Sequence, residues 1–248
     1  MARVRAVLFD VDGTLLDSND AQSHAWLDAL RGHGIDVPLD DVRACVGMHP
    51  EDLLAELTEV VPRSAAGRAI EDLRSVILRE HYAADLGPLP GARALVDRLR
   101  SRGLTCIAVA SGSRVEVDVL LRAATVADLI DVVVCGEDVR TSASEPRASV
   151  QLVQLGLARA EVAAAEAVLV GDTPHDVEAA RQVGVAAIAF RSGGFRDVDF
   201  EGALAVYEGP SDLASRLESS PFARGLEEGA GPSSRPPRRP PARGARGL

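Results

Sequence analysis

The sequence predicts an α/β protein, in which helices cover both faces of a parallel sheet and a helical domain is inserted near the start. Two observations carry this prediction. Short apolar stretches alternate with amphipathic stretches in the second half of the chain, and a long interval after the first apolar stretch has only helical patterns. Such alternation is typical of parallel sheets. The chain has 248 residues, 46% of them hydrophobic, which suffices for one core and a small second domain.

The predicted strands are short, rich in valine and isoleucine, and bounded by glycine, serine or aspartate. They cover residues 4–9, 105–110, 131–134, 167–170 and 186–189. Amphipathic patterns predict helices at 91–102, 114–124 and 174–183. Gly103 and Gly184 follow the first and last of these helices and are typical stop residues.

Residues 17–84 form the predicted insert. The interval is too long for one crossover between strands, and its apolar residues repeat with helical spacing, as Trp26 and Leu30 do. The predicted domains are therefore a core of residues 1–16 and 85–218 and a helical insert between its two parts. Because the insert follows the first strand directly, we expect it to cover the site at that strand's end as a cap.

Composition limits the partners and the compartment. The formal net charge of −10 argues against nucleic-acid binding by the folded body, and no apolar run approaches the ~20 residues of a membrane span. Three cysteines without metal-like spacing, and no visible secretory signal, predict reduced thiols in a cytoplasmic protein. Residues 219–248, rich in proline and arginine, are predicted to be disordered. We expect a monomer or a homodimer.

Two aspartates follow the first predicted strand, in the run Asp10-Val11-Asp12-Gly13-Thr14. Residues at i and i+2 of a strand point the same way, so Asp10 and Asp12 would share the carboxyl edge of the sheet, where α/β proteins bind ligands. One carboxylate can attack a phosphoryl group, and the other can protonate the leaving oxygen. Gly13 permits a tight turn that brings N–H groups to phosphate oxygens, and we group Thr14 with it as phosphate-binding.

A second acidic motif follows the strand at 167–170. Asp172 lies at the end of that strand, and Asp176 lies four residues later in the first turn of a helix. Carboxylates are suitable ligands for Mg²⁺, which also keeps several waters. We therefore expect a Mg²⁺ site formed by Asp10, Asp12, Asp172 and Asp176.

A hydroxyl motif follows the strand at 105–110. Ser111 and Gly112 stand between that strand and a predicted helix. A serine hydroxyl together with the N–H groups of a helix N-terminus can bind an anion, although serine at this position is also a common helix cap. We expect Ser111 and Gly112 to bind phosphate.

These three motifs, in their order and spacing over residues 1 to about 215, resemble those of the haloacid dehalogenase superfamily. The likeness is to its phosphoglycolate phosphatase-like and β-phosphoglucomutase-like branch with a helical cap. The resemblance implies a Rossmann-like, doubly wound core, a Mg²⁺ cofactor, Asp10 as the nucleophile and Asp12 as the acid and base. It also implies that Ser111 binds the transferring phosphate and that Asp172 binds the metal. The acid at position 12 favours phosphoryl transfer, because release of a halide needs no proton.

The sequence departs from the family pattern at the third motif, which is usually a lysine. The chain contains no lysine, and alignment on Pro146 puts either Ala143 or Glu145 at that place. Arg140 or Arg147 could supply the charge, since arginine can clamp phosphate, but its shape differs from that of lysine. The alternative is a degenerate site that binds phosphate and turns over poorly.

Substrate recognition is expected from the cap, because the core handles only the phosphate and the metal. His24, Met48 and His49 are the candidate substrate residues. The predicted function is a Mg²⁺-dependent phosphatase of a small phosphorylated metabolite that works through an aspartyl-phosphate intermediate. A sugar phosphomutase is the alternative enzyme, and a phosphate-binding pseudoenzyme is the alternative outside catalysis.

Overall fold

The protein contains a six-stranded parallel sheet, seen in the computed structural model, which describes residues 3–139 and 147–224. The strand order β3-β2-β1-β4-β5-β6 is that of a doubly wound Rossmann-like fold, as predicted. The strands are β1 (Ala6–Phe9), β2 (Thr105–Val109), β3 (Val132–Val134), β4 (Ala167–Gly171), β5 (Ala186–Phe190) and β6 (Ala205–Tyr207).

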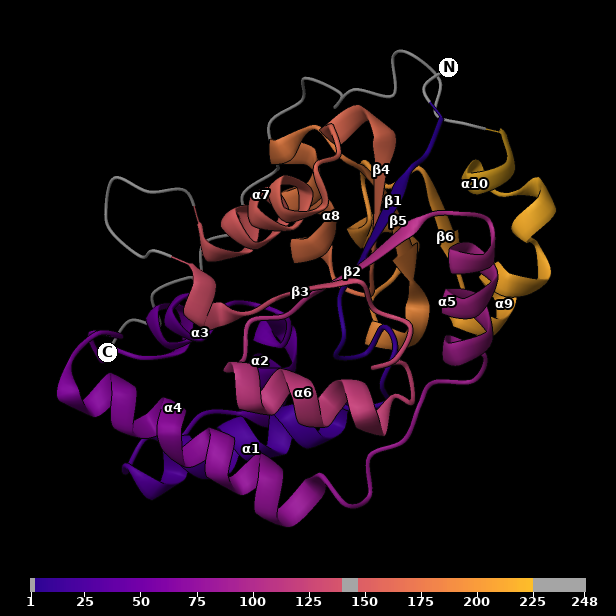
Figure 1. Cartoon of the computed structure of the whole chain (residues 1–248). Coiled ribbons are helices and arrows are strands. Elements are labelled where there is room, and N and C mark those ends of the chain that lie inside the picture. Colours follow the sequence, from indigo (N-terminus) through magenta and orange to yellow (C-terminus); the bar gives the residue numbers. More distant parts are fainter. Residues whose placement is uncertain (1–2, 140–146, 225–248) are drawn as a thin grey trace.

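Helices cover both faces of this sheet (Figure 1). On one face the apolar core includes Phe9 and Phe190, and on the other it includes Leu8 and Leu169, because successive strand residues point to opposite sides. The first face is covered by α5 (Ala92–Ser101), α6 (Arg114–Ala123) and α9 (Pro210–Ser215), and the second by α7 (Ala148–Ala160) and α8 (Pro174–Val183). The short helix α10 (Pro221–Arg224) ends the described chain.

Four of these elements were not predicted from the sequence: β6, α7, α9 and α10. Helix α10 lies within residues 219–248, which were predicted to be disordered. Strand β6 has only three residues and lies at the edge of the sheet, so its apolar pattern is too short to detect. Helix α7 contains Gly156, a residue that lowers helix propensity. A Cβ atom at Gly156 would lie 3.1 Å from Leu8 and 3.2 Å from Ile107, so the glycine lets α7 approach the sheet closely.

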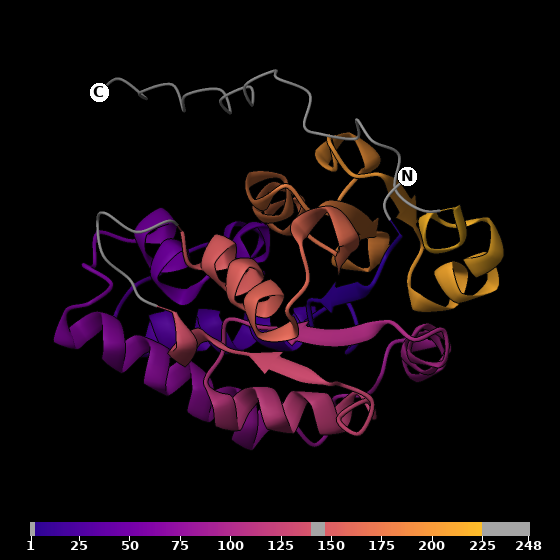
Figure 2. The ribbon, with the colours of Figure 1, turned by 45° about the horizontal axis from the view of Figure 1, so that its top comes forward.

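The interval between β1 and β2 is helical, with a hydrophobic cluster of its own. It contains α1 (Asn19–Gly32), α2 (Leu39–Cys45), α3 (Pro50–Leu57), α4 (Ala65–Ile77) and a π-helical turn, η1 (Leu78–Tyr82). Trp26, Leu30, Leu53 and Ile70 are buried against one another in this cluster. We call this interval the helical insert; it lies along one side of the sheet layer in both views (Figures 1 and 2).

The two chain connections between the sheet and the helical insert lie side by side. The Asp17 N–H donates to the Gly87 carbonyl over 2.9 Å, and the Leu89 N–H donates to the Leu15 carbonyl over 3.0 Å. This pairing brings the start and the end of the insert together at the carboxyl end of β1. The predicted domain limits at positions 17 and 84 stay a prediction.

The remaining expectations concern the tail, the cysteines and the membrane. Residues 221–224 of the predicted tail form α10, and residues 225–248 lie outside the described part of the chain. Cys45, Cys106 and Cys135 are buried free thiols. Within the described residues, every helix is too short or too polar to cross a membrane.

Candidate active site

Three polar side chains of the site follow neighbouring strands at one edge of the sheet. Asp10 and Asp172 come directly after β1 and β4, and Ser111 lies two residues after the end of β2. These strands are adjacent and parallel. The Asp10 N–H donates to the Val170 carbonyl over 3.0 Å, which continues the pairing of β1 with β4 by one residue. The sheet register therefore brings residues from positions 10, 111 and 172 to one place, as the motifs predicted.

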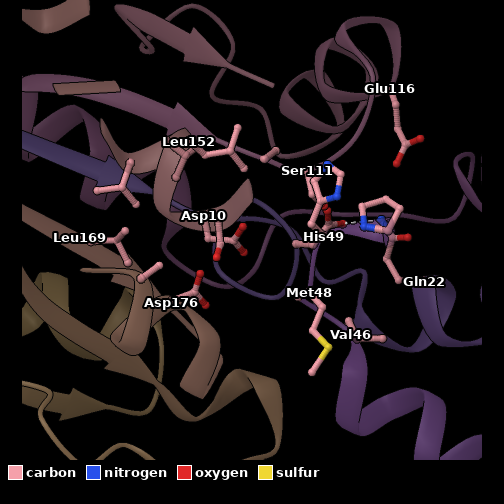
Figure 3. Close-up of a pocket in the computed structure, with 18 of the residues that line it drawn as sticks. Asp10, Gln22, Val46, Met48, His49, Ser111, Glu116, Leu152, Leu169 and Asp176 are labelled. Atoms are coloured by element: carbon pink, nitrogen blue, oxygen red, sulfur yellow. Dashed lines mark hydrogen bonds between the residues drawn. The ribbon is translucent and has the colours of Figure 1, made fainter. Parts of the chain in front are cut away.

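Three carboxylates gather at this edge. Asp10, Asp172 and Asp176 each offer an oxygen, and these oxygens all lie within 4.8 Å of one another. Figure 3 shows Asp10 and Asp176 together on one side of a pocket. Asp176 reaches the cluster from the first turn of α8, where it also accepts from the Thr173 hydroxyl over 2.7 Å and the Thr173 N–H over 3.0 Å. This reciprocal cap holds the helix start and fixes the carboxylate.

Asp172 is held by two donors. The Thr14 hydroxyl donates to Oδ1 over 3.0 Å, and the Asn19 amide donates to Oδ2 over 2.8 Å. Thr14 also lies 3.4 Å from Asp10 Oδ2. The Thr14 hydroxyl is thus committed to the carboxylates. The Thr14 N–H donates to the Val11 carbonyl over 3.4 Å, so in this structure neither donor of Thr14 is available for the predicted phosphate contact.

The electrostatics of the cluster fit a divalent cation. Burial and the charges of Asp176 and Asp172 raise the pKa of Asp10 well above its usual value. Burial, together with the charge of Asp176, raises the pKa of Asp172 to about 8. Among the described residues, no arginine pairs with these three acids. Buried carboxylates gathered without a cation repel one another, and hard cations prefer such oxygen ligands. The donor set therefore suits a divalent metal ion.

The carboxylate of Asp12 lies apart from this cluster. The Ser18 hydroxyl and the Gln22 amide both donate to its Oδ1, over 2.6 Å and 2.9 Å. Burial raises the pKa of Asp12, and these two hydrogen bonds partly oppose that rise. Asp12 was grouped with the metal ligands from the sequence, but its side chain is oriented by the helical insert instead. A partly buried carboxyl with a raised pKa is suited to donating a proton.

Gly13 shapes the turn between the two aspartates and the insert. It has a φ of +72°, and an added Cβ atom would lie 2.1 Å from Asp172 Oδ2 and 2.2 Å from the Asn19 amide nitrogen. The Ser192 hydroxyl donates to the Gly13 carbonyl over 2.6 Å. Only glycine fits this position, because both the backbone conformation and the packing exclude a side chain.

The helical insert borders the site on the side that faces away from the sheet. A cavity of about 60 Å³ lies between the sheet edge and the insert. Asp10, Asp12 and Ser111 line it from the sheet edge, and Met48 and His49 line it from the insert. Figure 3 shows Ser111 and His49 beside Asp10. A cavity of this size holds a few waters, whereas metabolite sites have volumes of several hundred Å³.

The three candidate substrate residues lie in different places. His49 is buried, and its Nδ1 accepts from the Glu51 N–H over 3.3 Å, which leaves the proton of the neutral ring on Nε2. Burial lowers the pKa of His49, so the neutral form is favoured. Met48 also lines the cavity. His24 is outside it, with Nδ1 at 2.7 Å from the Asp20 carbonyl in its own helix.

An ion pair that the sequence analysis missed links the insert to the core. Arg74 on α4 donates to Glu116 on α6 over 2.5 Å, and the side chains are 4% and 2% exposed. Arg74 also donates to the Gln22 amide oxygen over 3.3 Å, and Ser75 donates to Glu116 over 3.0 Å. The Arg74 guanidinium lies 5.3 Å from the centre of the Trp26 ring. Arg74 interrupts the apolar face of Ile70, Leu73 and Ile77, and this signal could have identified it.

The two arginines proposed to replace the lysine are not both visible. Arg140, like Ala143 and Glu145, lies outside the described residues. Arg147 is exposed and lines a neighbouring hollow with His49 and Glu178. In the described part of the chain, Arg74 is the one arginine that lines the cavity with Asp10, and Glu116 already neutralises it.

Comparisons with known proteins show to which family this chain is related. The family model of the haloacid dehalogenase-like hydrolases matches residues 7–190. Phosphoglycolate phosphatase of Synechococcus elongatus is 31% identical over 202 residues, covering 78% of this chain and 86% of that protein. Hexitol phosphatase A of Escherichia coli is 32% identical over 194 residues, covering 75% and 83%.

A solved structure shows the same fold. A hydrolase from Pseudomonas syringae superposes with a TM-score of 0.78 at 26% identity, covering 87% of this chain and 98% of that one. The family match spans all three strand-end motifs, from Asp10 to Asp176. The chain belongs to the haloacid dehalogenase-like hydrolase family.

Proposed function

We propose that the protein is a Mg²⁺-dependent phosphatase that hydrolyses a small phosphorylated metabolite. The observation that carries the proposal is the division of the acids into two groups. Asp10 shares a metal-suited cluster with Asp172 and Asp176, whereas Asp12, two residues away and partly buried, has its own hydrogen bonds. A nucleophile beside a cation and a separate proton donor are the two groups that this reaction needs.

In the proposed reaction, a carboxylate oxygen of Asp10 attacks phosphorus, and the bond from phosphorus to the alcohol oxygen breaks. Asp12 gives its proton to the departing oxygen. Asp12 then accepts a proton from a water that attacks the aspartyl phosphate, which releases inorganic phosphate and restores Asp10. Mg²⁺, held by Asp10, Asp172 and Asp176, would reduce the repulsion between the nucleophile and the phosphoryl oxygens. Ser111 and the N–H group of Gly112 would bind those oxygens. The Gly13 N–H, also predicted to do so, donates to the Leu16 carbonyl over 2.8 Å instead.

The helical insert would act as a cap in this scheme. Its residues Met48 and His49 face the cavity, and the neutral His49 ring can donate from Nε2 to a bound substrate. Opening would admit the substrate, and closing would exclude bulk water during transfer. The three buried thiols suit a reducing compartment such as the cytoplasm.

A degenerate phosphate-binding site is the second candidate. The observation that favours it is that Arg74, the one arginine lining the cavity in the described chain, is already paired with Glu116. Loss of one preorganised cation beside a phosphoryl group costs roughly 10²–10³ in rate.

The deciding experiment measures hydrolysis of p-nitrophenyl phosphate with and without Mg²⁺, with Asp10→Asn purified in parallel. The phosphatase proposal predicts turnover that needs Mg²⁺ and is lost in Asp10→Asn. Equal background rates in both proteins, together with Mg²⁺ binding by the wild type in calorimetry, would instead support the degenerate site.

A further inference from the structure

In the proposed reaction, the alcohol part of the substrate would lie beside Asp12, and we call this part of the cavity the alcohol end. One positive and one negative side chain, Arg74 and Glu116, lie there as a pair. Asp12, which would protonate the leaving oxygen, accepts from Gln22, and Gln22 accepts from Arg74. The Arg74–Glu116 pair therefore lies one side chain beyond Asp12, where the alcohol part of a substrate would be bound. In Figure 3, Gln22 and Glu116 lie across the pocket from Asp10 and Asp176.

This pair has hydrogen-bonding capacity left over. The Nε–H of Arg74 is buried and has no hydrogen-bond partner. Arg74 itself is 3% exposed, and it belongs to the lining of the cavity. Each oxygen of Glu116 accepts one hydrogen bond from the helical insert, from Arg74 and from Ser75. A carboxylate has about four acceptor positions in total, so Glu116 can accept more.

The pair is also neutral as a whole. A substrate carboxylate or a second phosphate would need a free cation at this place, but the charge of Arg74 is offset by Glu116. An added anion would lie beside the Glu116 carboxylate in a buried setting, where like charges repel strongly. A hydroxyl group meets no such penalty, because it carries no charge and can donate to Glu116.

We propose that the Arg74–Glu116 pair selects a substrate whose alcohol part is uncharged and rich in hydroxyl groups, a sugar or polyol monophosphate, against substrates that carry a second anion. The inference rests on the proposed phosphatase function and names its substrate class. Arg74 and Glu116 thereby become specificity-determining residues contributed by the insert and the core.

The test compares phosphate release by the wild-type protein, with Mg²⁺ at pH 7, from two groups of compounds. Sorbitol 6-phosphate and glucose 6-phosphate represent the hydroxyl-rich monophosphates, and 2-phosphoglycolate and fructose 1,6-bisphosphate carry the second anion. We expect kcat/KM for the better compound of the first group to exceed that for both of the second by about tenfold or more. A preference for 2-phosphoglycolate or the bisphosphate would overturn the inference.

The variant Glu116→Gln frees the charge of Arg74 while it keeps a hydrogen-bonding side chain. Its ratio of kcat/KM for 2-phosphoglycolate to that for the polyol phosphate should rise about tenfold. The matched control is Glu218→Gln, which removes the same charge from an exposed site and should leave the ratio unchanged. An equal loss on both substrates in Glu116→Gln would mean that the pair only holds the insert in place, and would overturn the inference.

Hydrolysis of p-nitrophenyl phosphate separates the two proposals. If it needs Mg²⁺ and Asp10 while the preference for hydroxyl-rich compounds is absent, the substrate inference fails and the phosphatase function stands. If neither p-nitrophenyl phosphate nor any of the four metabolites is hydrolysed, the phosphatase function fails and the inference falls with it. The wild-type comparison does not depend on the folding of a variant with a broken buried pair.

Discussion

The carboxylate cluster predicts that Mg²⁺ stabilises the protein more at neutral pH than in acid. Burial and neighbouring charges raise the pKa of Asp172 from 3.8 to about 8. Between these two values the folded protein keeps a proton that the unfolded chain releases. The free energy of unfolding of the metal-free protein therefore falls as pH rises from about 4 to about 8.

The size of this loss follows from the pKa of Asp172. Each pH unit above 3.8, the pKa of Asp172 in the unfolded chain, lowers the free energy of unfolding by about 1.4 kcal/mol. The free energy of unfolding of the metal-free protein is therefore lowered by about 2 kcal/mol at pH 5 and by about 4 kcal/mol at pH 7. A divalent cation that replaces the proton removes most of this penalty. At 2–4 °C per kcal/mol for a chain of this size, the increase in Tm on adding Mg²⁺ should be roughly 5–10 °C larger at pH 7 than at pH 5.

The assay is thermal unfolding followed by circular dichroism at pH 5, 6 and 7, with saturating MgCl₂ or with NaCl of equal ionic strength. Asp172→Asn removes the charge and a ligand, so it should raise the Tm of the metal-free protein at pH 7 and abolish the Mg²⁺ effect. Asp128→Asn, at an exposed carboxylate paired with Arg93, should keep the Mg²⁺ effect. The same Mg²⁺ increment at every pH, or none at all, would refute the argument from the buried carboxylates.

Three further predictions concern single positions. Gly13→Ala should lower the free energy of unfolding, measured in urea, by more than about 2 kcal/mol, because the added Cβ would meet Asp172. Gly34 has a similar φ of +75° but open space around it, so Gly34→Ala should lower the free energy of unfolding by about 1 kcal/mol. Cys106, whose pKa burial raises to about 12, should react with a thiol reagent at pH 8 only after unfolding in urea, and fast labelling of the folded protein would contradict its burial. Arg147→Ala should change kcat for p-nitrophenyl phosphate less than twofold, because Arg147 is exposed outside the cavity; a tenfold loss would show that it does compensate for the missing lysine.

The core was predicted from short patterns of apolar and polar residues in the sequence. Each strand-end motif combines an apolar strand with a polar residue directly after it, and such a pattern fixes both the strand and the edge at which Asp10, Ser111 and Asp172 meet. The covering helices at 91–102, 114–124 and 174–183 were identified for the same reason, since each has one apolar face and a distinct start or stop. The short edge strand β6 lacks such a signal.

The contacts between the helical insert and the core could not be predicted from such short sequence patterns. Arg74 and Glu116 are 42 positions apart and lie on helices whose relative placement depends on how the insert folds back. The motif at Asp12 indicated an acid and base but not its partners, because Ser18 and Gln22 are brought to it only by the first turns of α1. Spacing along the chain predicts which residues share an edge of the sheet, whereas the partners across two domains need the structure.

The cavity is therefore divided into two halves with different charge. At the end proposed to hold the phosphoryl group, Asp10, Asp172 and Asp176 are gathered without a protein cation among the described residues. In the proposed reaction, a bound metal ion would have to offset both these acids and the incoming phosphate. At the alcohol end, Arg74 is balanced by Glu116, and the groups offered to a substrate are hydrogen-bonding and neutral. A chain without lysine could thus bind a phosphate ester if a metal ion supplies the positive charge beside the phosphate. Arg74, paired with Glu116, would then contribute to binding the hydroxyl groups of the alcohol. The metal would then govern the chemistry, and the pair between insert and core would govern which alcohol is released.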